Sequence, residues 1–177
     1  MPGLCDYRSF IDDLEDELGR IETILTRQDA SGVPCARGCS ACCRAFTVLP
    51  VEAFAIIDNP AFCAFDPPVP GACPFLTRDL ACAIYTARPF LCRTRGFPVL
   101  HLNGDGDWER DSCSRRSYPP RGSGGLHLED WNARLYRINE DFCREKGLSP
   151  HRVTLDEIRR AHAPRAGAYA ALAGPAR

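Results

Sequence analysis

Four cysteines stand within nine residues, in the segment Cys-Ala-Arg-Gly-Cys-Ser-Ala-Cys-Cys at positions 35–43. Thiolates that are two or three residues apart can chelate one soft metal ion, because a tight turn directs both sulfur atoms inward. Cys35, Cys39 and Cys42 follow this spacing, and the small residues between them permit such a turn. The segment therefore predicts a metal-binding loop around which the rest of the chain is organised.

The total cysteine content decides between a metal and disulfide bonds. The chain holds 11 cysteines, an odd number, and its start lacks the basic and apolar regions of a signal peptide. We therefore expect a cytoplasmic protein, in which thiols stay reduced and a high cysteine density indicates metal binding. No run of about 18 apolar residues occurs, so no membrane-spanning segment is expected.

Size and charge exclude further classes of protein. With 177 residues the chain is long enough for one domain and too short for two large ones. The formal net charge is −1, and no stretch collects basic residues without acidic neighbours, which argues against a nucleic-acid partner. We expect a single domain over residues 1–163 and a frayed Ala/Gly/Pro-rich tail over 164–177.

Apolar residues near the start of the chain recur at steps of three and four, which predicts an amphipathic helix over about residues 5–29. The apolar stripe consists of Leu4, Tyr7, Ile11, Leu14, Leu18, Ile21 and Leu25. We expect this stripe to pack on its own domain. Because the pattern also fits about three heptads, a protein partner bound through this N-terminal helix is the alternative.

The middle of the chain reads as short elements joined by loops. Residues 49–58 are expected to form a short helix with Pro50 in its first turn. Two small hairpins are predicted over 75–85 and 96–109, the second with an Asn-Gly-Asp-Gly-Asp turn. Together with the first cysteine segment they form the predicted metal-binding core over about 35–113.

The last predicted elements are helices within about 127–162. Acidic residues in the first turn and basic residues in the last turn mark the longer helix, and Thr154 with Glu157 forms a capping box for a second one. The predicted fold class is therefore α+β, a small single domain with amphipathic helices at both ends of a loop-rich, hairpin-containing cysteine centre.

Four later cysteines lie in predicted loops or hairpins and join the candidate ligands. The full set of candidates is Cys35, Cys39, Cys42, Cys43, Cys73, Cys82, Cys92 and Cys113. Cys5, Cys63 and Cys143 are assigned no ligand role, because cysteine is also a common small apolar residue. Side chains on adjacent residues point in different directions, so we expect Cys42 and Cys43 to have different roles.

A buried thiolate site also needs compensating charge. Four thiolates around zinc, or around an oxidised 4Fe–4S core, leave a net charge of about −2. Arg44, Arg88 and Arg93 follow or precede candidate cysteines closely in sequence, so they are candidates for offsetting this charge and for favouring thiolate over thiol.

Three blocks, C-A-R-G-C-S-A-C-C, C-P-F-L and C-A-I-Y-T-A-R-P-F-L-C-R, follow one another between residues 35 and 95. Together they resemble the CxxCxxCC cysteine-cluster family, also called YkgJ-like, which is described as a zinc- or iron-chelating domain. The chain departs from the family pattern at the first gap, where three residues stand in place of two. The resemblance implies that the metal or cluster ligands are Cys35, Cys39, Cys42, Cys43, Cys73, Cys82 and Cys92. It also matches the family's tyrosine and Arg-Pro pair to Tyr85, Arg88 and Pro89.

These observations predict a metal-binding protein that holds an iron–sulfur (4Fe–4S) or iron centre with a redox or cofactor-supporting role. The alternatives are a structural zinc or interaction module without catalysis, and metal storage or delivery. A similarity of the cysteine pattern to flagellin lysine-N-methylases implies a methyltransferase-like role as a further option. The Asp105 and Asp107 turn lacks the downstream glutamate of an EF-hand, so it predicts no calcium site.

Overall fold

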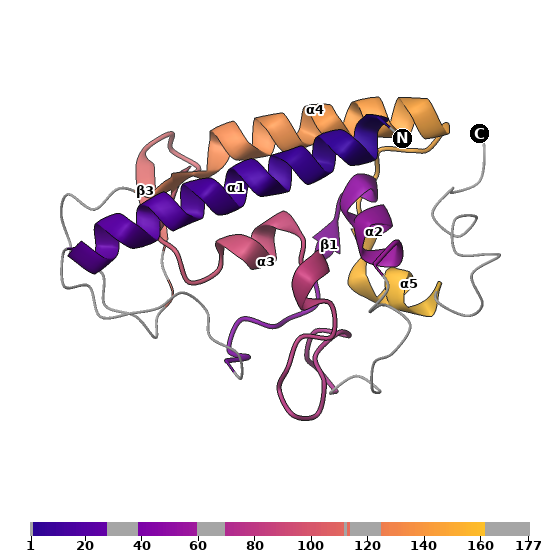
Figure 1. The fold of residues 1–177 in the computed structure, drawn as a ribbon, viewed down its shortest axis with the longest axis horizontal. Coiled ribbons are helices and arrows are strands. Elements are labelled where there is room, and N and C mark those ends of the chain that lie inside the picture. Colours follow the sequence, from indigo (N-terminus) through magenta and orange to yellow (C-terminus); the bar gives the residue numbers. More distant parts are fainter. Residues whose placement is uncertain (1, 28–38, 60–69, 112, 114–124, 162–177) are drawn as a thin grey trace. The chain divides into compact units, whose positions relative to one another are not determined.

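The computed structural model describes residues 2–27, 39–59, 70–111, 113 and 125–161, which form a small α+β fold, as predicted (Figure 1). The helices are α1 (Pro2–Arg27), α2 (Pro50–Ile57), α3 (Phe90–Thr94), α4 (Leu128–Lys146) and α5 (Leu155–Arg160), with a 3-10 turn η2 (Tyr85–Ala87). The strands are β1 (Thr47–Val48), β2 (Val99–Leu102), β3 (Trp108–Asp111), β4 (Leu126–His127) and β5 (Val153–Thr154). Within the described residues, no helix is both long and apolar enough to cross a membrane.

Two compact units make up the chain, and each is assembled from segments that are far apart in the sequence. The first unit comprises Met1–Tyr7, Arg37–Pro89 and Tyr136–Arg177, and the second comprises Arg8–Ala36 and Phe90–Leu135. Helices α1 and α4 contribute residues to both units. The expected single domain over 1–163 and its tail stay predictions.

The core of the first unit is built on aromatic packing between α2 and α4. The Phe142 side chain is fully buried, and its ring meets the ring of Phe54 edge to face at a centroid distance of 4.9 Å. Gly3 of α1 lies so close to Phe142 that an added Cβ would stand 3.0 Å from its Cα. A glycine at this position therefore permits the start of α1 to pack directly on α4.

Helix α2 has Pro50 in its first turn, as predicted, and the N–H groups at its start are satisfied by buried side chains. Leu49 donates its backbone N–H to Glu52 Oε2 at 2.9 Å, and Val51 donates to Asn139 Oδ1 of α4 at 3.2 Å. These bonds replace the side-chain cap that a leucine cannot provide. They fix the entry of α2 against α4 just after the first cysteine segment.

A two-stranded antiparallel sheet ties the cysteine segment to α5. Thr47 pairs with Thr154 and Val48 with Val153, and Leu155 donates its N–H to Phe46 O at 3.2 Å. The predicted capping box is confirmed, since Thr154 N–H donates to Glu157 Oε2 at 2.8 Å and Glu157 N–H donates to Thr154 Oγ1 at 3.1 Å. The start of α5 is thus held next to the backbone that follows Cys43.

The predicted N-terminal helix is confirmed as α1, and its apolar stripe is buried except at Ile11, which is half-buried. In the second unit the fully buried ring is Phe10, which meets Phe90 and Trp131 edge to face at 5.7 and 5.4 Å. The stripe therefore packs against other parts of this chain, which is the outcome that we expected in preference to packing on a helix of a partner protein.

The second unit also holds a three-stranded sheet in the order β3–β2–β4. The predicted hairpin is confirmed as β2 and β3, with Leu102 opposite Trp108, and its turn lies where the Asn-Gly-Asp-Gly-Asp sequence predicts it. The sequence did not indicate β4, which pairs in parallel with β2 and places His127 opposite Leu100. Trp108 lies against His127 at 5.2 Å across the same face of the sheet.

We expect Phe142→Ala to lower the free energy of unfolding by about 3–5 kcal/mol, because it leaves a large cavity beside Phe54. The matched control is Tyr136→Ala on the same helix, where the side chain is 46% exposed and the loss should stay within about 1 kcal/mol. Urea unfolding followed by circular dichroism measures both values. Equal losses in the two variants would contradict the assignment of Phe142 to the core.

Candidate metal centre

The first cysteine segment is described from Cys39 onward, and it forms consecutive tight turns. Cys43 donates its N–H to Ser40 O at 3.0 Å, and Arg44 donates to Cys42 O at 2.9 Å. Cys42 is exposed, whereas Cys39 and Cys43 are half-buried. The two adjacent cysteines therefore differ in exposure, and their different ligand roles stay a prediction.

Cys73 joins this loop through the backbone. Its N–H donates to Cys43 O at 3.0 Å, and its own carbonyl accepts from Leu76 N–H at 2.9 Å, which closes a turn over Cys73–Leu76. Cys43 and Cys73, which are far apart in the sequence, are therefore held side by side by a hydrogen bond between their backbones.

Cys82 lies in a minimal hairpin where the sequence predicted one. Leu76 and Cys82 form an antiparallel bridge, and Ala83 N–H donates to Phe75 O at 2.9 Å. Thr77 closes the turn, because its Oγ1 accepts from Ala81 N–H at 3.0 Å. This hairpin places Cys82 beside the Cys73 turn.

Burial dominates the electrostatics of Cys73. It raises the pKa of this thiol to about 11, and the negative charges of Cys82 and Asp156 raise it further. Backbone N–H groups of Phe75 and Leu76 donate toward the sulfur and act in the opposite direction. Such donors stabilise a thiolate, and they are already in place around a sulfur that stays protonated without a cation.

Cys82 has the same arrangement with a different neighbour. Burial raises the pKa of its thiol, while the backbone N–H of Ile84 and the charge of Arg88 lower it. The Arg88 guanidinium lies over the Tyr85 ring, 3.9 Å from its centroid, and its Nε donates to Tyr85 O at 3.1 Å. Arg88 is therefore held in place by Tyr85 and lies close enough to Cys82 to offset thiolate charge.

The other candidate arginines lie in different settings. Arg44 is an exposed residue of the first cysteine segment. Arg93 belongs to α3 in the second unit, where its guanidinium forms an ion pair with Glu15 of α1. Charge compensation by either residue stays a prediction.

The remaining cysteines fall outside this group. Cys92 and Cys113 are half-buried residues of the second unit, and their role as ligands stays a prediction. Cys35 and Cys63 lie outside the described residues. Cys5 is exposed on α1, so it does not act as a small buried apolar residue. Cys143 is buried, and its thiol donates to Asn139 Oδ1 at 3.8 Å.

Most of the described candidate cysteines belong to one unit, but they do not form a coordination site. Among the described residues, no three histidine, cysteine, aspartate or glutamate side chains converge closely enough to hold a metal ion. Five candidate cysteines nevertheless belong to the first unit: Cys39, Cys42, Cys43, Cys73 and Cys82. A chelate would require these turns to close by side-chain rotation and loop movement.

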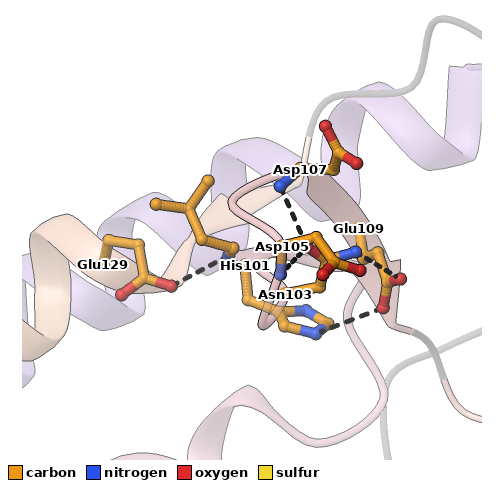
Figure 2. Close-up of polar contacts among 7 residues, drawn as sticks. His101, Asn103, Asp105, Asp107, Glu109 and Glu129 are labelled. Carbon is orange, nitrogen blue, oxygen red and sulfur yellow. Dashed lines mark hydrogen bonds and ion pairs between the residues drawn. The ribbon is translucent and has the colours of Figure 1, made fainter.

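The acidic turn of the second unit is held together by its own side chains, as Figure 2 shows. Asn103 Oδ1 accepts from the backbone N–H groups of Asp105 and Asp107 at 3.0 and 2.9 Å, and its amide donates to Glu109 at 2.9 Å. Glu129 of α4 accepts from Leu102 N–H at 3.0 Å. These contacts account for the turn as a structural feature of the hairpin.

Sequence reasoning missed Asp156 as a neighbour of the cysteines. The capping box places this residue in the first turn of α5, but the pairing of β1 with β5 is what brings that turn to the cysteine segment. A strand of two residues is too short to show an alternation of apolar and polar residues, so the local sequence does not predict the pairing of β1 with β5.

No family model, curated protein or solved structure matches the chain. The resemblance to the CxxCxxCC cysteine-cluster family therefore stays a prediction that rests on the three cysteine blocks.

We expect Cys73 of the metal-free protein to alkylate slowly at pH 8, because with a pKa of about 11 only about one molecule in a thousand carries the thiolate. Its rate should rise about tenfold per pH unit, while exposed Cys42 labels sooner. The raised pKa also means that the folded protein keeps the Cys73 proton to a higher pH than the unfolded chain does. The free energy of unfolding should therefore fall as the pH rises from 9.0 to about 11. Iodoacetamide labelling read by peptide mass spectrometry measures the rates. A Cys73 rate that levels off near neutral pH would contradict this.

Leu80, in the turn before Cys82, has φ 61°, in the left-handed region that a leucine rarely adopts. It is 44% exposed, so its side chain contributes little burial. We expect Leu80→Gly to be as stable as the parent or up to about 1 kcal/mol more stable, and Leu80→Val to lose about 1 kcal/mol or more. Urea unfolding of both variants gives the order, and a valine variant as stable as the glycine variant would rule out backbone strain.

Proposed function

We propose that the first unit is a metal-binding cysteine cluster that holds an iron–sulfur (4Fe–4S) or iron centre with a redox or cofactor-supporting role. The observation that carries the proposal is the convergence of three separate cysteine segments. The Cys73 N–H bonds to Cys43 O, and the Leu76–Cys82 bridge brings the third segment to the same turn. Cysteines that served only as small buried apolar residues would not require their three segments to lie next to one another.

The surroundings of the sulfur atoms support a bound cation. Backbone N–H groups already point at the sulfurs of Cys73 and Cys82, and Arg88 supplies a positive charge near Cys82. Thiolates are soft ligands that suit iron–sulfur clusters, iron and zinc, whereas calcium and magnesium prefer oxygen. The donor set therefore fits a soft or borderline metal.

The proposal assigns a role to each group of residues. Ligands are drawn from Cys39, Cys42, Cys43, Cys73 and Cys82, with Cys35, Cys92 and Cys113 as further candidates. An iron–sulfur centre would supply one-electron transfer, and its potential would depend on hydrogen bonds to the sulfurs and on exposure. The chain's own groups would set that potential, since the N–H donors and Arg88 stabilise the more negative, reduced state. We place the protein in the cytoplasm, where its thiols would stay available for metal.

A structural zinc module without catalysis is the second candidate. It is favoured by the segment over 70–89, where the described structure holds turns, one bridge and the η2 turn, with no longer element. Such a segment gains stability from a metal that links its turns, and an all-thiolate zinc site is typically closed to substrate. Metal storage or delivery uses the same ligands, and a methyltransferase-like role is supported by the cysteine pattern alone.

We expect protein purified under anaerobic conditions to carry iron and sulfide and to absorb broadly at about 400 nm. Cys42→Ser and Cys43→Ser should each lower the metal content, because the serine oxygen is a poor substitute for a thiolate. Elemental analysis and the absorption spectrum measure both effects.

The matched control is Cys5→Ser, which changes an exposed cysteine on α1 and should leave the metal content unchanged. A colourless protein with stoichiometric zinc would replace the iron centre by the zinc alternative. Parent protein that binds neither metal after reconstitution would refute the cysteine cluster itself.

A further inference from the structure

Strand β3 lies at one edge of the three-stranded sheet of the second unit, whose order is β3–β2–β4. Asn103 donates its N–H to Asp107 O at 2.9 Å where the hairpin closes, and in an antiparallel pair such bonded positions alternate with positions whose backbone groups point outward. Trp108 follows Asp107, so its N–H and C=O point away from β2. These two groups form no hydrogen bond among the residues that the structure describes. We call this side of β3 the open edge.

The other side of the hairpin is closed by the chain itself. Leu102 lies opposite Trp108 and also points its N–H outward, where Glu129 Oε1 of α4 accepts it at 3.0 Å. Strand β4 pairs with the first half of β2, is two residues long, and is followed directly by α4. Unpaired backbone groups along a strand are a template for another extended chain. The open edge of β3 is therefore where this sheet can take up a further strand.

The side chains of β3 separate negative charge from aromatic surface. Because successive side chains of a strand alternate, Asp107, Glu109 and Asp111 lie on one face, and Trp108 and Arg110 lie on the other. The three acidic residues are exposed, and Trp108 is 55% exposed. Glu109 is engaged by the hairpin turn, but the carboxylates of Asp107 and Asp111 form no hydrogen bond or ion pair within the described part of the chain. Figure 2 shows the Asp107 carboxylate directed away from the turn.

These charges discriminate between possible occupants of the open edge. A second copy of β3, paired antiparallel about Glu109, would place Glu109 opposite its own copy and Asp107 opposite Asp111. Directly opposed like charges destabilise a strand pair, so the edge disfavours pairing with itself. A strand with Lys or Arg at every second position would instead place a positive charge opposite each carboxylate, which stabilises the pair.

We propose that the open edge of β3 binds an extended segment of a partner protein that carries Lys or Arg at alternate positions. The segment adds to the sheet as a further strand and bonds to the backbone N–H and C=O of Trp108. Its basic side chains lie against Asp107, Glu109 and Asp111, and its intervening side chains pack on the Trp108 ring. This surface belongs to the second unit and involves no cysteine, so the proposal is independent of the metal centre.

The test adds a synthetic probe, the peptide acetyl-Thr-Lys-Val-Lys-Val-Lys-Thr-amide, to the full chain labelled with ¹⁵N. In the free protein the Trp108 amide should exchange its hydrogen quickly, because it points to solvent. When about nine-tenths of the protein is bound, this exchange should slow about tenfold, since only the free fraction exchanges. The same peptide with glutamate in place of lysine should give no protection.

Two comparisons separate strand addition from simple charge attraction. The peptide residues that face Trp108 are the ones that bond to its backbone, so N-methylation of both valines removes these bonds and keeps every charge. This methylated peptide should lose the protection of the Trp108 amide and bind at least about tenfold more weakly. The Asp107→Asn/Asp111→Asn variant should bind the parent peptide about 2- to 25-fold more weakly, as expected for two lost cross-strand charge pairs.

The matched control is Asp12→Asn/Asp16→Asn, which removes two exposed carboxylates from α1 in the same unit and should leave the affinity at the parent value. An equal affinity for the methylated peptide would overturn strand addition, and an equal affinity for the glutamate peptide would overturn the choice of a basic partner. Absence of binding would overturn both. Protection of the Trp108 amide that rises with protein concentration alone, together with a dimer in sedimentation, would assign the edge to a second copy and overturn the proposal.

Discussion

The hydrogen bond from Cys73 N–H to Cys43 O is the contact on which the candidate centre depends. It joins two cysteine segments through backbone atoms, so the side chains that would bind a metal are not used to hold the segments together. Cys82 is likewise positioned by backbone atoms, through its bridge to Leu76, so its side chain is not needed to hold the segment in place. The framework and the ligands are therefore separable: a cysteine can be exchanged for serine without removing the bonds that position it.

Around this framework the charges are arranged unevenly. Arg88 lowers the pKa of the Cys82 thiol, whereas Asp156 raises that of Cys73, and burial raises both. Removing the proton from Cys73 is thus costly in the absence of a cation, and the affinity of this site for the proposed metal would depend strongly on pH. The N–H groups directed at both sulfurs act against that cost, which is the usual way a protein reconciles buried sulfur with negative charge.

What the sequence could predict follows from which interactions are local. The stripe of α1, the Pro50 start of α2, the hairpin of β2 and β3 and the Thr154 capping box are all encoded within a few residues of each other, and all were confirmed. One detail differs: Phe10 is fully buried, whereas Ile11, which the predicted stripe includes, is half-buried. The buried face of α1 is therefore rotated slightly from the predicted one. By contrast, the pairings of β1 with β5 and of β2 with β4 join segments of two to four residues, too short to carry a period. The neighbourhood of Asp156 and Cys73 depends on the first of these pairings, so it was out of reach from sequence alone.

This division between local and distant interactions also indicates what a metal would have to organise. Helices α2, α4 and α5 carry buried apolar side chains, among them Phe54, Phe142 and Ile158, and hydrophobic burial of this kind stabilises them without any ligand. The turns around Cys73 and Cys82 also carry buried apolar side chains, namely Phe75, Leu76 and Ile84. By contrast, every residue of the turns over 39–44, which hold Cys39, Cys42 and Cys43, is half-buried or exposed. Because the helical part already fixes the start of α5 and the backbone of Cys43, an incoming cation needs to order only the turns. The conformational entropy lost on binding is then limited to those short segments, which favours a site completed by its metal on a scaffold that folds before it.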